Sequence, residues 1–210
     1  MKKWVIKQPD TKAVSVITSK TDIKKTAAEI LVSRGIDTIE KIKDFFSDDI
    51  LSSPFLLKDM QEAVDIINNA IEDQKTICIF GDYDCDGIIS TVILYLYLEC
   101  LGAEVSYYIP ERDEGYGMSC DAVRKLSEQG IQLIITVDNG ISAIKEAELI
   151  KELGMELVIT DHHQPSDVLP TAGAIVDPHR NDCISPFKYL CGAGVVLKLL
   201  AALDDGNYEA

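Results

Sequence analysis

The sequence lacks several features that would place it in a class at once. None of its six cysteines has a partner at Cys-x-x-Cys spacing, so we interpret them as reduced and structural, as in a cytoplasmic protein. The apolar patch within residues 1–9 is too short for a signal peptide, and the apolar run over 88–98 is too short to span a bilayer. No internal repeat and no low-complexity tract is present. These absences favour a globular protein without a membrane partner.

Positive charge is also scarce. The chain carries 20 Lys and Arg residues against 35 Asp and Glu, a formal net charge of −15. This argues against a surface that grips nucleic acid by bulk electrostatics. It leaves open a nucleic acid that reaches a cleft charged by bound cations, because the ions reverse the local sign. With 210 residues, 47% of them hydrophobic, the chain is long enough for one moderate α/β domain and a small appendage.

The pattern from residue 58 onward alternates between strands and helices. This predicts an α/β fold: a mostly parallel, doubly wound sheet with helices on both faces. Residues 1–55 are predicted to form a small helical N-terminal segment, with Asp22 and Asp37 as N-caps, and 56–210 the α/β domain. The strands are expected over 76–80, 104–109, 132–137, 156–160 and 173–176. The helices are expected over 58–73, 88–101, 119–129, 141–153 and 192–203.

An acidic loop, Gly81-Asp82-Tyr83-Asp84-Cys85-Asp86-Gly87, stands between the first predicted strand and the next helix. Ligands of open α/β sheets bind at such carboxyl ends of strands. Three carboxylates within five residues repel one another and raise each other's pKa values. A divalent cation relieves this repulsion, and hard oxygen ligands suit Mg²⁺ and Mn²⁺. The loop therefore predicts a metal site.

Three other interpretations of this loop compete with a metal site. A solvated polar loop would be the better explanation of a lone Asp-x-Asp. An EF-hand matches at Asp82, Asp84, Asp86 and Gly87, but its twelfth position falls on Ile93 where a bidentate Glu is required. A P-loop fails because no Gly-Lys-Ser/Thr follows.

Two further polar clusters end predicted strands. Asp138-Asn139-Gly140 follows the third strand, and Thr160-Asp161-His162-His163 ends the fourth. A single Asp-Asn-Gly is compatible with a plain turn, and a lone histidine is more often structural than a ligand. In a parallel sheet, however, all three clusters lie at one edge. The set suits metal-assisted hydrolysis of a phosphate ester, in which a histidine that is not a ligand contacts a phosphate oxygen or donates a proton.

These motifs, in this order and spacing, resemble the first three motifs of the DHH phosphoesterase superfamily. Within it the sequence is most similar to the RecJ-type single-strand-specific exonucleases, over roughly residues 58–205. Two further stretches are RecJ-like: Ile109-Pro110-Glu111-Arg112 with Glu114-Gly115-Tyr116-Gly117, and Phe187-Lys188-Tyr189-Leu190-Cys191-Gly192-Ala193-Gly194-Val195.

The resemblance implies a role for each motif residue. One or two Mn²⁺ or Mg²⁺ ions would be held by Asp84, Asp86, Asp138 and His162. Asp82 would be a further ligand or an acid behind the ligands, Asp161 would orient a histidine, and His163 would face the scissile phosphate. The candidate substrate-binding residues are Arg112, Asn139 and Gly140. For Arg112, a salt bridge with a neighbouring acid is an equally good interpretation.

The resemblance further implies 5′→3′ hydrolysis of single-stranded DNA in repair and recombination. RecJ-like enzymes carry a fourth acidic motif after a helix like that ending near Leu203, then a closing domain and an oligonucleotide-binding fold. Asp177 comes too early for that motif. We therefore expect a truncated catalytic domain with weak or no processive activity of its own. A single-strand-binding protein or a helicase would engage regions outside this sequence.

Two other functions stay open from the sequence. One is a phosphodiesterase of short oligonucleotides or cyclic dinucleotides. The other is a non-catalytic module that binds metal or docks a partner. The presence of both histidines and all the motif acids argues against the second.

Overall fold

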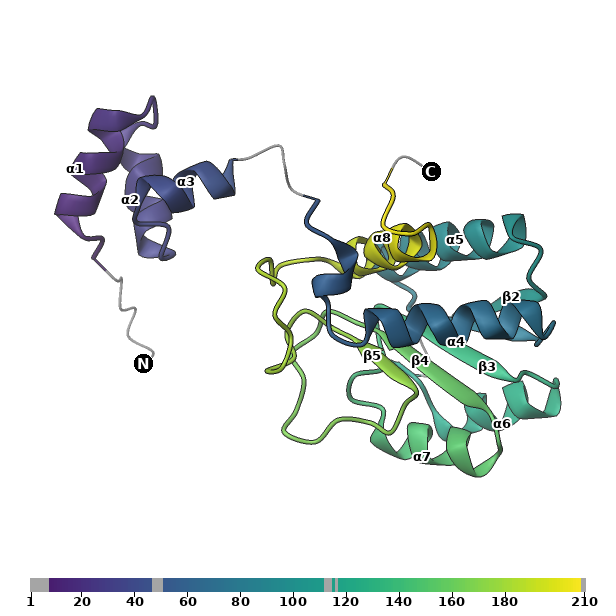
Figure 1. The fold of residues 1–210 in the computed structure, drawn as a ribbon. Helices are drawn as coiled ribbons and strands as arrows, with labels where there is room; N and C mark the ends of the chain where they lie inside the picture. Colours follow the sequence, from purple (N-terminus) through teal and green to yellow (C-terminus); the bar gives the residue numbers. More distant parts are fainter. Residues whose placement is uncertain (1–7, 47–50, 112–114, 116, 209–210) are drawn as a thin grey trace, which may run out of the picture. The chain divides into compact units, whose positions relative to one another are not determined.

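The computed structural model describes residues 8–46, 51–111, 115 and 117–208 (Figure 1). The chain divides into two compact units, with the boundary between residues 50 and 51. The first unit contains α1 (Thr11–Lys20), α2 (Lys25–Ser33) and α3 (Ile39–Phe45). The three helices bury a small apolar core made by Val14, Ile17, Ala28, Leu31, Val32 and Ile42.

Both predicted N-caps in the first unit are wrong. Helix α2 begins after Lys24, which is extended, and no side chain caps it, so Asp22 lies in the bend before the helix. Helix α3 is capped by Thr38, whose hydroxyl accepts from the Lys41 amide. Asp37 instead pairs with the Lys41 ammonium at 2.8 Å. An N-cap residue has an extended backbone, and in each helix this residue lies one or two positions after the predicted aspartate.

The second unit contains a five-stranded sheet in which every neighbouring pair is parallel, in the order β2-β1-β3-β4-β5. The predicted α/β fold is confirmed, and each strand end lies within one residue of its predicted place. The strands are β1 (Ile77–Phe80), β2 (Val105–Tyr108), β3 (Leu133–Val137), β4 (Glu156–Thr160) and β5 (Ala174–Val176).

Helices cover both faces of this sheet (Figure 1). Helices α4 (Met60–Glu72), α5 (Cys85–Cys100) and α8 (Gly192–Leu203) pack on one face, and α6 (Cys120–Glu128) and α7 (Ile144–Glu152) on the other. A short 3-10 turn, η1 (Pro54–Leu56), precedes α4. Successive β1 residues alternate between the two cores, because strand side chains point to opposite faces. Among the described residues, no helix has the length and apolar character needed to cross a membrane.

Two helix starts differ from the sequence prediction by three residues. Helix α5 begins at Cys85 rather than residue 88, because the Asp84 side chain caps it. Helix α7 begins at Ile144 rather than residue 141, because residues 141 and 142 form a turn first. The sheet order places β1 between β2 and β3: the chain passes from β1 to β2 at one side, then returns across β1 to β3 and continues on the other side to β4 and β5. The loops after β1 and β3 therefore flank the switch point where open α/β sheets bind ligands.

Candidate metal centre

The loop after β1 is folded tightly around its own carboxylates. Asp84 Oδ1 accepts from the amides of Asp86 and Gly87, each at 2.9 Å, which caps α5. Asp82 is buried and accepts from the Tyr83 amide at 2.7 Å. A Cβ atom on Gly87 would lie 2.6 Å from Asp82 Cβ, so the close approach requires glycine. Burial raises the pKa of Asp82, and the negative charge of Asp84 adds to this rise.

Asp86 points from the same loop to the start of α8. Its Oδ2 accepts from the Gly192 amide at 2.7 Å, and its Oδ1 accepts from the Ala193 amide at 2.9 Å. Burial acts to raise the pKa of Asp86, but these two amide hydrogen bonds outweigh it and hold the pKa below its usual value. Asp86 Oδ2 also lies 3.7 Å from His162 Nε2. The structure therefore joins the acidic loop to a helix that is distant in sequence.

Asp138 follows β3 and lies at the middle of the site. Its backbone is left-handed, with φ of 62°, and its side chain is 2% exposed. His162 Nε2 lies 3.0 Å from Asp138 Oδ1, although no hydrogen bond is aligned on that oxygen. Burial, followed by the negative charges of Asp86 and Asp84, raises the pKa of Asp138 to about 7. A cation beside Asp138 would relieve this repulsion.

Ligand atoms from three strand ends converge around Asp138. Among the residues described, one group of potential ligand atoms within 4.8 Å of one another comes from Asp138, His162 and His163. A second such group comes from Asp82, Asp84 and Asp138. The two groups share Asp138, so its carboxylate belongs to both candidate ligand sets. The structure brings together every predicted ligand, with Asp86 joined through its contact with His162.

Asp161 organises the two histidines after β4. It is 1% exposed, and its Oδ1 accepts from the amides of His162 and His163 at 2.7 and 3.2 Å. His163 Nδ1 lies 2.7 Å from the same oxygen, while Oδ2 accepts from the Ile141 amide at 2.9 Å. Burial opposes ionisation, but the hydrogen bonds from His163 and Ile141 lower the pKa of Asp161. The bond to Asp161 raises the pKa of His163 to about 9, so its imidazole is cationic at neutral pH.

Two of the three predicted substrate-binding residues, Asn139 and Gly140, make close contacts within the protein. The Asn139 amide donates to the carbonyls of Phe80 and Val137 at 3.2 and 3.0 Å, which fastens the ends of β1 and β3 together. Gly140 has φ of 110°, and a Cβ there would lie 2.5 Å from Thr136 Oγ1. Both residues hold the shape of the loop at the site. Arg112 lies outside the described residues.

The sequence analysis missed Asp177 as a residue near this site. It follows β5 and is completely buried; one carboxylate oxygen accepts from the His179 amide at 2.6 Å. Burial raises the pKa of Asp177 to about 7, and the neighbouring charge of Asp161 acts in the same direction. The sequence did indicate this position, since Asp177 directly follows the predicted strand 173–176, just as Asp138 and Asp161 directly follow their predicted strands. The amides of α8 that bind Asp86 had no such signal.

Unpartnered polar atoms concentrate at the same edge of the sheet. The buried side-chain atoms without a hydrogen-bond partner among the described residues are Thr136 Oγ1, Asp138 Oδ1, Asn139 Oδ1 and Asp177 Oδ2. All four belong to the ends of β3 and β5. Buried polar atoms normally have partners, so atoms left open beside crowded carboxylates are suited to bound ions or water. Oxygen ligands with one or two imidazoles fit Mn²⁺ or Mg²⁺.

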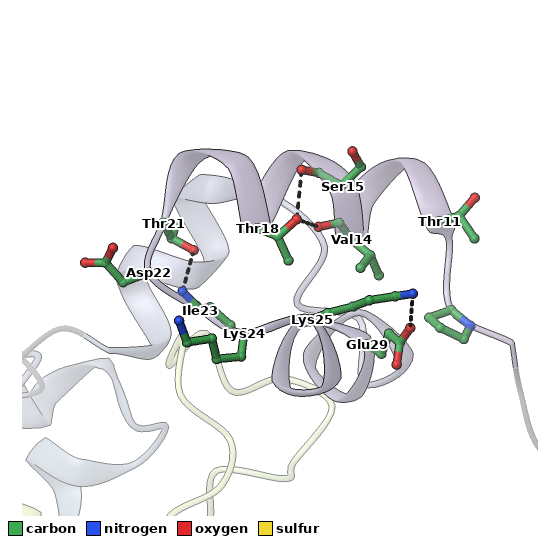
Figure 2. Close-up of a pocket in the computed structure, with 11 residues that line it drawn as sticks. Thr11, Val14, Ser15, Thr18, Thr21, Asp22, Ile23, Lys24, Lys25 and Glu29 are labelled. Carbon is green, nitrogen blue, oxygen red and sulfur yellow. Dashed lines mark hydrogen bonds and ion pairs between the residues drawn. The ribbon is translucent and has the colours of Figure 1, made fainter.

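A hollow of about 670 Å³ lies in the first unit and has a different character (Figure 2). Two of its lining hydroxyls bond to their own helix or turn: Thr18 donates to the Val14 carbonyl, and Thr21 accepts from the Ile23 amide. Lys25 and Glu29 in its wall pair with each other at 3.9 Å. These polar groups are bonded within the first unit. The unpartnered buried atoms lie at the edge of the sheet, which we take as the candidate site.

Comparison with known proteins agrees with this geometry. Residues 76–210 match the model of the DHH family, N-terminal domain, a match that covers all five strands and the three polar strand ends. The chain belongs to the DHH family.

Several of the relatives that it matches carry the same description. The chain is 46% identical over 204 residues to the single-stranded-DNA-specific exonuclease RecJ of Bacillus subtilis, covering 96% of this chain and 26% of that protein. A RecJ structure from Thermus thermophilus in complex with Mn²⁺ aligns with a TM-score of 0.70 and 30% identity, over 95% of this chain and 28% of that one. An exonuclease RecJ bound to manganese aligns at 0.66 and 37%, over 71% and 38%. The chain thus spans about a quarter of the length of the curated relatives it matches.

Proposed function

We propose that this chain carries the metal centre of a phosphodiesterase that removes nucleotides from the 5′ end of single-stranded DNA. The observation that supports this most directly is Asp138, a buried carboxylate shared by two groups of potential ligand atoms. The similarity to single-stranded-DNA-specific exonucleases, and to RecJ structures holding Mn²⁺, supports the choice of substrate and ion. We assign this chemistry to residues 56–210, with DNA repair and recombination in the cytoplasm as its setting.

The ligands we propose come from three strand ends. Asp84, Asp138 and His162 would hold Mn²⁺ or Mg²⁺, with Asp82 completing the oxygen side. Asp86 would contribute through the lone pairs that the α8 amides leave open, since each of its oxygens accepts one amide. Bound cations would polarise a phosphoryl oxygen and supply an activated water.

The protein's own groups would position and protonate the substrate. His163 is held by Asp161 and is cationic at neutral pH, so it suits the negative charge that develops on the phosphate. Because Nδ1 makes the contact with Asp161, the other ring nitrogen, Nε2, would donate a proton to the leaving oxygen. Asp161 keeps the ring in one orientation, because its carboxylate also accepts the backbone amides of His162 and His163.

A direct test compares substrates with the full-length gene product in Mn²⁺. We expect single strands labelled at the 3′ end to shorten stepwise from the 5′ end, with duplex and dinucleotide substrates cleaved slowly. Asp138→Asn should abolish cleavage and strongly weaken Mn²⁺ binding. A matched control is Asp121→Asn, on the exposed surface of α6, where the carboxylate pairs with Arg124. Preferred cleavage of dinucleotides would point to the short-substrate phosphodiesterase, and unchanged activity in Asp138→Asn would refute the proposal.

A further inference from the structure

A pair of exposed aromatic side chains lies in the chain shortly before α8, the helix whose first amides bind Asp86. Phe187 and Tyr189 lie in the segment that joins β5 to α8, which runs along the edge where the strands end (Figure 1). Tyr189 is 82% exposed and Phe187 is 44% exposed. Their ring centroids are 6.0 Å apart, with planes at 76°. We call residues 184–190 the aromatic loop. Metal binding alone does not explain why this loop exposes two aromatic rings.

The aromatic loop is held in place from both sides. The Lys188 ammonium donates to the Cys183 carbonyl at 2.7 Å, and the Ser185 hydroxyl donates to the Phe187 carbonyl at 3.4 Å. Leu190 packs against the main core. The two rings therefore face solvent from a backbone that is tied down on either side of them. A ligand that covers them meets a preformed surface and loses little conformational entropy in ordering it.

The loop also leads directly into the centre. Gly192 follows Tyr189 by three residues, a stretch that spans at most about 10 Å. The Gly192 amide binds Asp86, and a Cβ on Gly192 would lie 2.5 Å from Asp138 Oδ1. The backbone that carries Tyr189 is thus close in the chain to the residue that contacts both Asp86 and Asp138.

We propose that Phe187 and Tyr189 form a stacking platform for the unpaired bases of a nucleic acid whose phosphate lies at the metal centre. This inference rests on the proposed function and adds the group that recognises the base. The charge of −15 leaves little bulk attraction for the backbone, so binding must draw on cations and on contacts to bases. Aromatic rings supply such contacts without regard to sequence, and only unpaired bases offer their faces.

The test measures binding of a short oligothymidylate with hydrolysis-resistant phosphorothioate linkages to the full-length gene product in Mn²⁺, by fluorescence anisotropy. Tyr189→Ala should weaken binding about 10-fold, while Tyr189→Trp should restore it. The same oligomer with abasic sites should bind more weakly to the unaltered protein, and Tyr189→Ala should then cost nothing more. The control is Tyr107→Ala, which removes a ring that is 62% exposed on β2, at the opposite edge of the sheet from β5.

The outcomes separate the platform from its alternatives. Equal binding by Tyr189→Ala and the unaltered protein would overturn the platform. An equal loss on intact and abasic oligomers would also overturn it, because the ring would then act on the backbone or on another part of the protein. Hydrolysis of a base-free phosphodiester by both proteins at equal rates supports the platform and the proposed function together. If the unaltered protein hydrolyses nothing, the proposed function fails, while the binding comparison still decides the platform.

Discussion

The imidazole of His163 and the carboxylate of Asp161 form a pair in which Nδ1 and Oδ1 are 2.7 Å apart. Asp161 is almost completely buried, whereas the His163 side chain is 47% exposed. The carboxylate is therefore fixed and the imidazole reaches outward, as in sites where a carboxylate sets the direction of a functional histidine. The pair also sets the charge of the ring, since it raises the pKa of His163 to about 9.

The substitution Asp161→Asn should separate orientation from charge. A neutral amide could no longer stabilise an imidazolium, so the pKa of His163 should fall from about 9 towards its usual value. We expect hydrolysis at neutral pH to drop about 10- to 100-fold. NMR titration of the His163 ring checks the pKa, and a thermal melt checks the fold. An unchanged pKa in a folded variant would show that Asp161 does not control the ring.

Asp138→Asn should act in opposite directions on the metal-free and metal-bound protein. Without metal, the substitution removes a buried charge that Asp86 and Asp84 repel, so the melting temperature at neutral pH should rise. With Mn²⁺, it removes a shared ligand, so affinity should fall at least about 100-fold by isothermal titration calorimetry. Melts with and without Mn²⁺ show both effects. A lower melting temperature in both states would mean that Asp138 is mainly structural.

The stability of the metal-free protein should decrease as pH rises. Folding raises the pKa of Asp138 from 3.8 to about 7, so the folded state holds an extra proton between these values. The stabilisation from that proton is complete below pH 3.8 and is lost as pH rises through about 7. Asp177 acts in the same sense, and His163 continues the loss as pH rises through about 9.

Chemical denaturation at about pH 5 and pH 8 measures this slope. Asp138→Asn should flatten it, while the exposed-surface control Asp121→Asn should leave it unchanged. Mn²⁺ binding should show the opposite trend, because the ion competes with the proton on Asp138; affinity should grow with pH up to about 7 and then level off. A stability that grew over this interval in the metal-free protein would contradict the assignment.

Two glycines of α8 offer a matched pair of substitutions. Gly192→Ala places a Cβ 2.5 Å from Asp138 Oδ1, so Asp138 must move and Mn²⁺ affinity should fall. At Gly194 the nearest atom to a Cβ is the end of the Leu190 side chain, at 3.3 Å. Gly194→Ala should therefore be neutral or stabilise the helix by up to about 1 kcal/mol. Calorimetry with Mn²⁺ and thermal melts on both variants check this. Equal Mn²⁺ affinities would show that a Cβ at Gly192 does not disturb Asp138.

The sheet and the three polar strand ends could be predicted because their signals are local. Apolar runs such as 132–137 end at a polar residue, and parallel strands bring such ends to one edge. The acids and histidines were then placed together by topology alone. The caps were less predictable: Asp84 starts α5 earlier than its apolar run does, and the N-caps of α2 and α3 are not Asp22 and Asp37. Helix α1 was not predicted, because its apolar residues alternate with Ser and Thr residues that are weak helix formers.

Other features depend on contacts between distant segments. The amides of Gly192 and Ala193 carry no side-chain signal, so nothing in the sequence indicates that they bind Asp86. The burial of Asp177 likewise follows from the packing around β5. The sequence reveals which groups reach the edge of the sheet, but the hydrogen bonds between them are set by tertiary packing.

The bond between Asp86 and the first amides of α8 has a consequence for the order of assembly. Gly192 follows Asp86 by 106 residues, so the acidic loop leaves the ribosome long before its partner does. During synthesis, the amides that hold Asp86 in place arrive only after all five strands have been made. A nascent chain would thus be unable to set the direction of this carboxylate until α8 has emerged and docked.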